Sequence, residues 1–432
     1  MKALVIGAGI SGLDCARLLN KNGYDVYLTD MRAIQEKDSL VKEGIKIFDE
    51  GHPESLKNIK YDLIVKNPGI KYQTPFVDYF VKQGYLIYNE LDVASSLVKN
   101  YRFASVTGTN GKTTTTTLLG ELLKNINPLN DAVGNIGQAL STVVLKNGDI
   151  KLDLAVEISA FQLLGCHNYH PVVSVVTNLS PDHVDYFEKV DNYYQTKMRV
   201  YKYQKDDDWF LLNLDDELVV QYATNIPCKV VTYSLNKNAD LCLKDNHIYL
   251  FDQILFDTDD LQIPGKHNLY NAMVAAAMAY KMGVKPEQIK ETIRNFKGVE
   301  HRLQFVKEVN GVKYFNDSKG TNPASTAVAL KAFEKPVILL AGGYDKKTGF
   351  DDIRPYLNKV KTMYVFGETK YQLKELFPEA IICETLEEAT KLAYDNAKSG
   401  DTVLLSPMCA SWDQFKCFEE RGDLFVSIVK SF

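Results

Sequence analysis

The sequence lacks any Cys-x-x-Cys pair. Its seven Cys among 432 residues are scattered and odd in number. This argues against a disulfide scaffold or a zinc knuckle and fits a reducing compartment. Long apolar runs are also missing, because no stretch approaches the roughly 18 apolar residues of a membrane-spanning helix. The apolar run at residues 3–6 ends at Gly7, too early for a secretory signal. We therefore expect a cytoplasmic protein with no membrane insertion.

The sequence also lacks an excess of charge of either sign, since its formal net charge is only -5. Such a chain has no excess of positive charge that would favour binding to nucleic acid or to an anionic membrane surface. We therefore expect small-molecule partners, which need only local cations, and no nucleic acid. At 432 residues, with 45% hydrophobic and 24% charged residues, the chain is expected to form two to three globular domains. We find no internal repeat and no low-complexity linker.

The most informative stretch is TGTNGKTT at residues 107–114, which follows the apolar run 103–106 and precedes a helical pattern. Glycines after a strand let backbone N–H groups approach phosphate oxygens, and a helix N-terminus adds partial positive charge. Lys112 is expected to reach the outer phosphates of a nucleoside triphosphate, and the Thr113 hydroxyl to bind Mg²⁺. The usual first glycine would fall at Val106, so this is a shortened variant of the loop. The alternative is a chance Gly-Lys-Thr at a helix cap.

The first 90 residues predict a Rossmann-like unit. A buried strand at residues 3–6 leads into Gly7-Ala-Gly-Ile-Ser-Gly12, and a second strand ends at Asp30. This is a G-x-G-x-x-G fingerprint with an acid at the right distance for a ribose hydroxyl. The alternative is that the glycines serve only helix–strand packing. A different nucleotide motif begins after about residue 90, which leaves half of a dinucleotide fold and counts against a dehydrogenase.

Two strand ends of the central segment carry polar residues. One apolar strand leads into Glu157, and another leads into TNLSPDH at residues 177–183. Because the carboxyl ends of parallel strands meet at one edge of a sheet, Glu157 and His183 should lie beside the phosphate loop. Together with Thr113 they are plausible Mg²⁺ ligands, although Mg²⁺ prefers oxygen. A hydrogen-bonded structural role for His183 is an equal alternative.

The rest of the central segment gives weaker signals. Lys197 and Arg199 lie on a helix whose composition indicates solvated surface, and residues 209–231 indicate a hairpin. Asn268 and Asn271 share one face near the start of an Ala-rich helix. There the residues alone favour helix capping over contact with an adenine edge.

The last segment, from about residue 299, predicts another parallel α/β unit. Three polar stretches follow apolar strands: NDSKGTNP at 316–323, GGYDKK at 342–347 and SPMCASWDQF at 406–415. Lysines and hydroxyls so placed suit a carboxylate-bearing substrate, the alternative being ordinary turns with surface lysines. The predicted fold class is α/β with three domains: a Rossmann-like unit at 1–90, a central P-loop parallel sheet at 91–298 and a C-terminal Rossmann-like unit at 299–432.

In their order along the chain, these motifs resemble those of the muramyl-peptide ligases. The resemblance covers the whole chain and rests on TGTNGKTT, Glu157-Ile-Ser, TNLSPDH, GKHNLYN (265–271), EHRLQ (300–304), NDSKGTNPAST and SPMCASWDQFKCFEERG. The final motif and the Rossmann-like first unit favour the branch that adds D-glutamate. The resemblance implies that ATP phosphorylates the carboxylate of UDP-N-acetylmuramoyl-L-alanine. The amine of D-glutamate then attacks the acyl phosphate, and phosphate leaves through a tetrahedral intermediate, as a step of peptidoglycan precursor synthesis.

The resemblance also implies a role for each matching residue, and a monomer. ATP would contact Gly108, Thr109, Asn110, Gly111, Lys112, Thr113, Thr114, Asn268, Asn271, Arg302 and Asp317. Mg²⁺ would be held by Thr113, Glu157, His183 and Lys197, the last as a carbamate, which would reverse its surface interpretation. The nucleotide-sugar would meet Ile10, Ser11, Asp30, Arg32, Gly69, Asn135 and His183 on the first domain and at its border. D-glutamate would meet Lys319, Thr321, Lys346, Ser411 and Phe418 on the last domain, which would close over ATP. The catalytic set would be Lys112, Glu157, His183 and Lys197.

The sequence departs from the family pattern at three places and leaves rival functions open. Asn67 stands where Ser is usual before Pro-Gly, the GGYDKK loop varies across the family, and Trp412 replaces a smaller apolar residue. One rival is a ligase of different amino-acid specificity, including folylpolyglutamate synthase, although NDSKGTNP and CASWDQF speak against it. The others are an NAD-linked oxidoreductase that uses Gly7–Gly12 and a non-enzymatic ATP-binding scaffold.

Overall fold

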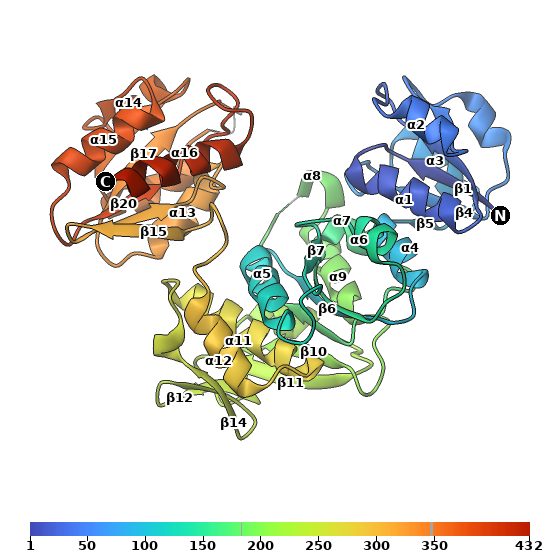
Figure 1. Cartoon of the computed structure of the whole chain (residues 1–432), viewed down its shortest axis with the longest axis horizontal. Coiled ribbons are helices and arrows are strands. Elements are labelled where there is room, and N and C mark those ends of the chain that lie inside the picture. Colours follow the sequence, from blue (N-terminus) through green and yellow to red (C-terminus); the bar gives the residue numbers. More distant parts are fainter. Residues whose placement is uncertain (183, 346–348) are drawn as a thin grey trace. The chain divides into compact units, whose positions relative to one another are not determined.

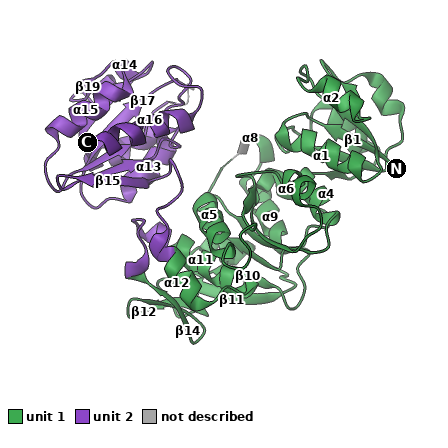
Figure 2. Cartoon of the chain, viewed as in Figure 1, with its two compact units in different colours: residues 1–258, 270–292 green, residues 259–269, 293–432 purple. Residues whose placement is uncertain are grey.

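A computed structural model describes residues 1–182, 184–345 and 349–432, and the chain divides into two compact units (Figure 2). The first unit comprises residues 1–258 and 270–292, and the second comprises residues 259–269 and 293–432. Two sheets lie in the first unit and one in the second (Figure 1). The predicted α/β class, with three sheet-based parts, is confirmed. The boundaries at residues 90 and 298 stay predictions.

The first sheet has five parallel strands in the order β3-β2-β1-β4-β5. Residues 3–6 of β1 alternate between two apolar clusters, which indicates that both faces of the sheet are buried. The strand order reverses at β1, so the loops after β1 and β4 diverge and leave room for a ligand. The elements are β1 Lys2–Ile6, α1 Ile10–Lys21, β2 Asp25–Thr29, α2 Lys37–Lys42, β3 Lys46–Phe48, η1 Glu54–Asn58, β4 Leu63–Lys66, α3 Pro75–Lys82 and β5 Ile87–Tyr88.

The second sheet has nine strands in the order β14-β13-β12-β11-β10-β9-β6-β8-β7, and its antiparallel pairs are β12–β13 and β13–β14. Its strands are β6 Tyr101–Thr107, β7 Ala132–Gly134, β8 Leu152–Glu157, β9 Val173–Val176, β10 Trp209–Asn213, β11 Lys229–Ser234, β12 Leu241–Lys244, β13 His247–Leu250 and β14 Gln253–Asp257. The helices between residues 90 and 295 are α4 Glu90–Ser96, α5 Lys112–Leu123, α6 Leu140–Asn147, α7 Ala160–Leu164, α8 Val184–Phe187, α9 Val190–Met198, η2 Arg199–Tyr201, α10 Glu217–Tyr222, η3 Thr258–Asp260, α11 Lys266–Met282 and α12 Pro286–Asn295.

The hairpin expected over residues 209–231 is wrong. Strands β10 and β11 are parallel neighbours, and α10 connects them. Two parallel neighbouring strands need a crossover connection, which here contains α10. Asp216 caps the N-terminus of α10 by accepting a hydrogen bond from Val219 N. The strand interpretation was right, but the connection was not.

The two sheets of the first unit are joined through α1, α4 and α6. Asp14 of α1 accepts a hydrogen bond from the Thr142 hydroxyl of α6. Leu18 of α1 belongs to the same apolar cluster as Val143 and Val144 of α6. A ligand bound at the first sheet can therefore extend toward the second within one compact unit.

The sheet of the second unit has six strands in the order β15-β16-β20-β17-β18-β19, of which only β15 is antiparallel. Strand β20 lies between β16 and β17, so the carboxyl ends of three strands meet there. Apolar clusters cover both faces. The elements are β15 Gln304–Val309, β16 Val312–Asn316, α13 Pro323–Lys331, β17 Val337–Gly342, η4 Asp351–Lys359, β18 Val360–Phe366, α14 Lys370–Leu376, β19 Ile381–Ile382, α15 Leu386–Asn396, β20 Thr402–Leu405 and α16 Phe418–Ser431.

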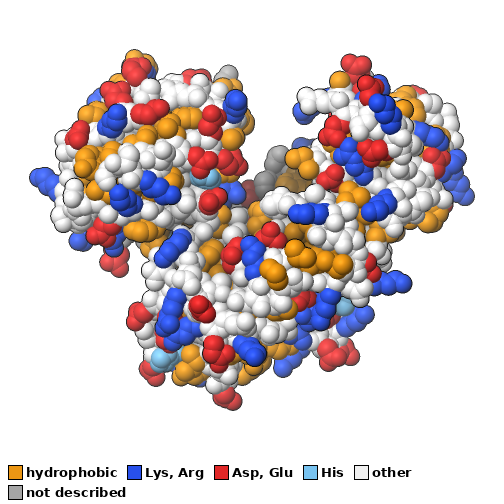
Figure 3. Space-filling model, in the orientation of Figure 1, with side chains coloured by type: hydrophobic (Ala, Val, Ile, Leu, Met, Phe, Trp, Pro, Cys, Tyr) orange, Lys and Arg blue, Asp and Glu red, His pale blue; other side chains and the backbone are white. Residues whose placement is uncertain are grey.

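The surface carries charges of both signs. Lys and Arg side chains are interspersed with Asp and Glu over the face drawn in Figure 3. None of the helices in the described part of the chain combines the length and the apolar character that crossing a membrane requires.

Candidate active site

The loop at residues 107–114 leaves β6 and enters α5, as the sequence predicts. Gly111 precedes the helix in a left-handed conformation, with φ of 83°. The segment that follows β9 supports the phosphate loop, because the Thr177 hydroxyl donates to Asn110 O at 2.6 Å. Asn178 Oδ1 accepts from Asn110 N at 2.9 Å. These bonds hold a glycine-containing loop at a helix N-terminus, which is the arrangement that binds phosphate.

Gly111 gives a test of this loop with a matched control. A Cβ at Gly111 would lie 2.5 Å from Asn271 Oδ1, whereas one at Gly23, which has the same φ of 83°, would meet nothing within 4 Å. Both Ala variants bear a backbone cost of roughly 1 kcal/mol, but only Gly111→Ala must also displace Asn271. We expect Gly111→Ala to weaken ATP binding by about tenfold or more, and Gly23→Ala to leave it unchanged. Titration calorimetry with ATP measures both, and equal affinities would contradict the placement of Asn271 against the loop.

Two lysine side chains converge on this loop. Lys112 Nζ and Lys197 Nζ both donate to Gly108 O, at 2.9 and 2.7 Å. Lys197 is only 1% exposed, and its Nζ lies 4.5 Å from the centroid of the Tyr193 ring. Burial, and after it the charge of Lys112, hold the pKa of Lys197 well below its usual range.

The surface interpretation of Lys197 and Arg199 is therefore wrong. Arg199 is partly buried and donates to Leu163 O and Cys166 O, both at 2.9 Å. Lys197 of α9 is directed toward the phosphate loop, and Arg199 of η2 is directed toward α7. Composition could not reveal this, because the side of a short helix that is covered depends on tertiary packing.

Glu157 ends β8 next to the phosphate loop, since Val106 of β6 pairs with Glu157. The side chain is 2% exposed, and its Oε1 accepts from Asn135 Nδ2 at 2.7 Å. Its Oε2 is buried with no hydrogen-bond partner among the described residues. A buried acceptor without a partner costs about 1–3 kcal/mol, and more if charged. An unpaired carboxylate oxygen at this edge therefore fits a bound cation.

The donor set suits Mg²⁺ better than a softer metal. Glu157 offers carboxylate oxygen and Thr113 a hydroxyl, and Mg²⁺ binds few protein oxygens together with phosphate and water. Across the residues that the structure describes, no group of three or more His, Cys, Asp or Glu side chains could hold a metal. The predicted ligand His183 lies outside the described residues.

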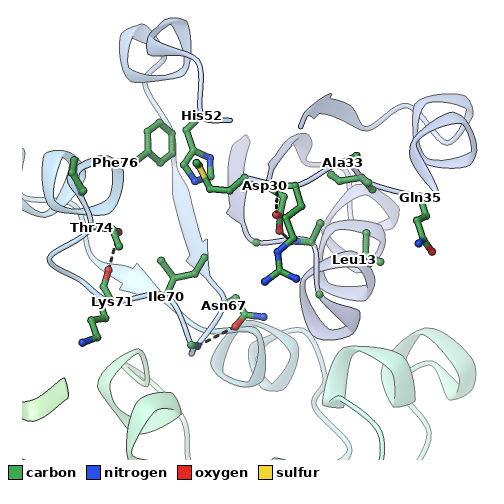
Figure 4. Close-up of a pocket in the computed structure, with 18 of the residues that line it drawn as sticks. Leu13, Asp30, Ala33, Gln35, His52, Asn67, Ile70, Lys71, Thr74 and Phe76 are labelled. Carbon is green, nitrogen blue, oxygen red and sulfur yellow. Dashed lines mark hydrogen bonds between the residues drawn. The ribbon is translucent and has the colours of Figure 1, made fainter. Parts of the chain in front are cut away.

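A cavity of about 1290 Å³ opens at the carboxyl edge of the first sheet (Figure 4). It is lined by three residues of the predicted nucleotide-sugar set, Asp30, Arg32 and Gly69. The Asp30 carboxylate already accepts from Ala8 N at 2.6 Å and from Arg32 N at 2.8 Å. Asp30 thus fixes the glycine loop, and a ribose hydroxyl would have to share its oxygens.

A second cavity, of about 380 Å³, lies where the two sheets of the first unit meet. Its lining includes Ser11, Gly69 and Asn135 from the predicted set. Since Gly69 lines both cavities, one elongated ligand could occupy both. Ile10 is 78% exposed and lines neither.

Sequence reasoning missed two residues of the larger cavity, His52 and Phe76. Their rings are stacked with centroids 4.4 Å apart, and both line the cavity (Figure 4). The imidazole Nδ1 lies 2.8 Å from the Thr29 hydroxyl. Neither residue belongs to a motif, so no signal in the sequence pointed to this aromatic wall.

The predicted helix-capping role of Asn268 and Asn271 is wrong. Helix α11 begins at Lys266, so both lie inside it. Asn268 Nδ2 donates to Pro264 O at 2.7 Å, and Asn271 Oδ1 accepts from the Thr115 hydroxyl at 3.2 Å. An N-cap side chain would instead accept from a backbone N–H.

In the second unit, Asp317 follows β16 and is buried. Its Oδ2 accepts from the Ser406 hydroxyl at 2.6 Å, and its Oδ1 accepts from Leu303 N at 3.2 Å. Burial raises the pKa of Asp317 to about 6, and the hydrogen bond from Ser406 and the charge of Arg302 offset this only in part. Because Leu303 N binds Asp317, the structure places the chain next to Arg302 beside Asp317, and both residues belong to the predicted ATP set.

Lys319, Ser411 and Phe418 of the predicted D-glutamate set also come from one region of the second unit. Lys319 Nζ lies 5.7 Å from the centroid of the Phe418 ring, and Thr321 N donates to Lys319 O. The buried Arg421 guanidinium binds backbone carbonyls of Ser318, Cys409 and Ala410, at 2.9 to 3.1 Å. Those carbonyls adjoin Lys319 and Ser411, so Arg421, which had no predicted role, connects the two loops. Lys346 lies outside the described residues.

Profiles of known families match most of the chain. The MurD-like N-terminal domain of Mur ligases matches residues 1–89, the Mur ligase middle domain matches residues 106–279, and the Mur ligase glutamate ligase domain matches residues 301–409.

Relatives named UDP-N-acetylmuramoylalanine–D-glutamate ligase are similar to the chain over its full length. The protein of Geobacillus sp. strain WCH70 is 39% identical, covering 99% of this chain and 97% of its own. Those of Bacillus subtilis strain 168 and Streptococcus thermophilus strain CNRZ 1066 are each 38% identical, over 99% of this chain and 96% and 97% of theirs.

Solved structures share the fold. The UDP-N-acetylmuramate-alanine ligase of Thermotoga maritima and a type C pseudomurein peptide ligase of Methanothermus fervidus each give a TM-score of 0.58. They are 20% and 19% identical, and each match covers 100% of this chain and 99% of the other. The profiles and the full-length relatives show that the chain belongs to the Mur ligase family.

Proposed function

We propose that this Mur ligase joins D-glutamate to UDP-N-acetylmuramoyl-L-alanine with ATP, releasing ADP and phosphate. One structural observation supports this proposal in addition to the similarity to the named relatives. Glu157, with an unpaired buried carboxylate oxygen, and the buried Lys197 lie at the edge of the sheet that bears the phosphate loop. The reaction is proposed to take place in the cytoplasm, in a monomer.

The chemistry explains why a ligase needs these groups. A carboxylate does not react with an amine at neutral pH, because oxide is a poor leaving group. Transfer of the γ-phosphoryl group to a carboxylate oxygen, with departure of ADP, gives an acyl phosphate. The amine nitrogen then bonds to the acyl carbon and loses a proton, and the carbon–oxygen bond to phosphate breaks. Because every reactant is anionic, the barrier falls mainly through positioning and charge compensation.

Lys112 is the cation proposed for the phosphates. In the structure its ammonium binds Gly108 O and Thr109 O, both at 2.9 Å, so it is held over the loop. Residues 108–114 would surround the phosphates with backbone N–H groups. We propose that Thr113 and Glu157 hold Mg²⁺, which when bound would neutralise charge on the phosphate oxygens. His183 is proposed as a further ligand.

Lys197 is proposed to act as a carbamate. Its lowered pKa leaves more of the amine neutral, and a neutral amine can bond through nitrogen to the carbon of CO₂ with loss of one proton. The product is an anion, which removes the repulsion between Lys197 and Lys112. Its oxygen atoms would then be available to the metal that Glu157 is proposed to hold.

The remaining contacts are proposed unit by unit. The uridine end would occupy the larger cavity with Asp30, Arg32 and exposed Ile10. The reacting end would pass Ser11 and Gly69 toward Asn135. ATP would also contact Asn268, Asn271, Arg302 and Asp317. D-glutamate would meet Lys319, Thr321, Lys346, Ser411 and Phe418.

The first test is the requirement for all three substrates. Mass spectrometry should detect the D-glutamyl product only when ATP, UDP-N-acetylmuramoyl-L-alanine and D-glutamate are all present, and Lys112→Ala should form none. Equal activity of Lys112→Ala would remove the phosphate loop from the mechanism. Tight NADH binding that ATP does not affect would instead favour an oxidoreductase.

A further inference from the structure

Lys66, the last residue of β4, is a buried cation that no motif explains. Its side chain is 3% exposed. Its ammonium donates to Asn67 O at 3.2 Å, Pro68 O at 3.4 Å and Ile70 O at 2.7 Å, and it lies 4.5 Å from the centroid of the Tyr72 ring. One side chain thus holds three carbonyls of the loop at residues 67–70.

The positive charge of Lys66 has no carboxylate beside it. No ion pair joins Lys66 to an acidic side chain within the described ranges, and burial alone lowers its pKa to about 8. The ammonium is therefore mainly charged at neutral pH. Burying a charge without a counter-ion is costly, so an anion bound at this loop would be favoured by the field of Lys66.

The loop held by Lys66 separates the two cavities of the first unit. Asn67 and Gly69 line both, while Ile70 lines the larger and Pro68 the smaller. Asn67 Oδ1 accepts from Gly69 N at 3.0 Å, which fixes the turn between them (Figure 4). A ligand that extends from one cavity to the other must cross this loop.

The same loop contacts the central sheet's helices. Ile70 O accepts from the Tyr186 hydroxyl at 3.3 Å as well as from Lys66. The Tyr186 ring meets the Phe161 ring edge-on at 4.6 Å, and Phe161 lines the smaller cavity. Lys66 therefore braces a loop whose other side is fixed by α8 and α7.

We infer that Lys66 is a positioning residue for the diphosphate of the nucleotide-sugar. In a UDP-sugar the diphosphate is the group between nucleoside and sugar, so a molecule with its nucleoside in the larger cavity places it over this loop. Lys66 holds the loop's shape and adds positive charge beneath it. The inference rests on the proposed function, from which the substrate is taken.

The test compares the variant Lys66→Met with two control variants, Lys66→Arg and Lys46→Met. Lys66→Met removes the charge at similar length, and Lys66→Arg keeps it. Lys46→Met removes a cation from β3 of the same sheet, where Lys46 pairs with Asp25 at 2.8 Å and lies over the Tyr27 ring. Steady-state kinetics should show KM for UDP-N-acetylmuramoyl-L-alanine raised about tenfold in Lys66→Met, because this variant loses the hydrogen bonds that hold the loop and the charge beneath it. Its kcat and its KM for ATP and D-glutamate should stay within about twofold.

The controls set the limits of the inference. Lys66→Arg should keep the nucleotide-sugar KM within about threefold of wild type, and Lys46→Met should not change it. An unchanged nucleotide-sugar KM in Lys66→Met, or a fall in kcat alone, would overturn the inference. If the wild-type protein does not bind the nucleotide-sugar at all, that result contradicts the proposed function and not only the role of Lys66.

A second measurement needs no folded variant. NMR of ¹⁵N-lysine in the wild type can follow the Lys66 ammonium while UDP is added as the probe. The inference predicts that the pKa of Lys66 rises as UDP binds, because an anion stabilises the ammonium. Saturation with UDP without any change in that pKa would overturn it, whatever Lys66→Met does.

Discussion

The Lys197→Ala variant should lose turnover by about 10³-fold, because it removes the proposed carbamate from the edge of the phosphate loop. The side chain is buried against Gly108 O and the Tyr193 ring, so its loss leaves a small space beside the loop. A small carboxylate such as formate could enter that space and supply the missing anion. Added formate should therefore restore part of the activity, measured as phosphate release.

The matched control for this prediction is Lys202→Ala. Lys202 follows the same helix but is exposed, and its ammonium lies 5.2 Å from the centroid of the Tyr203 ring. This variant should keep near-wild-type turnover and should not respond to formate. Near-normal activity of Lys197→Ala, together with no response to formate, would contradict a carbamate at Lys197.

The second large effect is expected for Glu157→Gln. The change keeps the shape of the side chain and its contact with Asn135, but it removes the charge on the unpaired oxygen. We expect kcat to fall by about 10²-fold and the Mg²⁺ concentration for half-maximal activity to rise. Phosphate release measured across a Mg²⁺ titration gives both quantities.

Glu121→Gln provides the control for Glu157→Gln. Glu121 lies in α5, half-exposed, and pairs with Lys124 at 2.7 Å on the surface. Removing this charge should change neither kcat nor the Mg²⁺ requirement, since a surface ion pair contributes little. If Glu157→Gln behaved like this control, Glu157 would not be the metal ligand.

The sequence predicted well what depends on local pattern. The strand–glycine–lysine order at residues 107–114 and the polar residues after apolar strands indicated where β6 and β8 would end, because a phosphate loop is built by consecutive residues. The parallel sheets followed from the alternation of strands and helices. The fingerprint at Gly7 likewise predicted a ligand site after the first strand, and a cavity lies there.

Features that depend on tertiary packing were not predictable. Lys197 looked like a surface residue because a helix of mixed composition does not reveal which side is covered. The link between β10 and β11 looked like a hairpin because strand pairing is decided by the whole sheet. Lys66 resembles an ordinary strand-end lysine, and only the path of the loop after it shows that its ammonium is buried under three carbonyls.

The most direct test of the central claim is an amino-acid panel. Phosphate release is measured with ATP, UDP-N-acetylmuramoyl-L-alanine and one of D-glutamate, L-glutamate or meso-diaminopimelate. We expect release with D-glutamate and little with the other two. Release with L-glutamate or meso-diaminopimelate but not with D-glutamate would contradict it and assign the protein to a Mur ligase of different specificity.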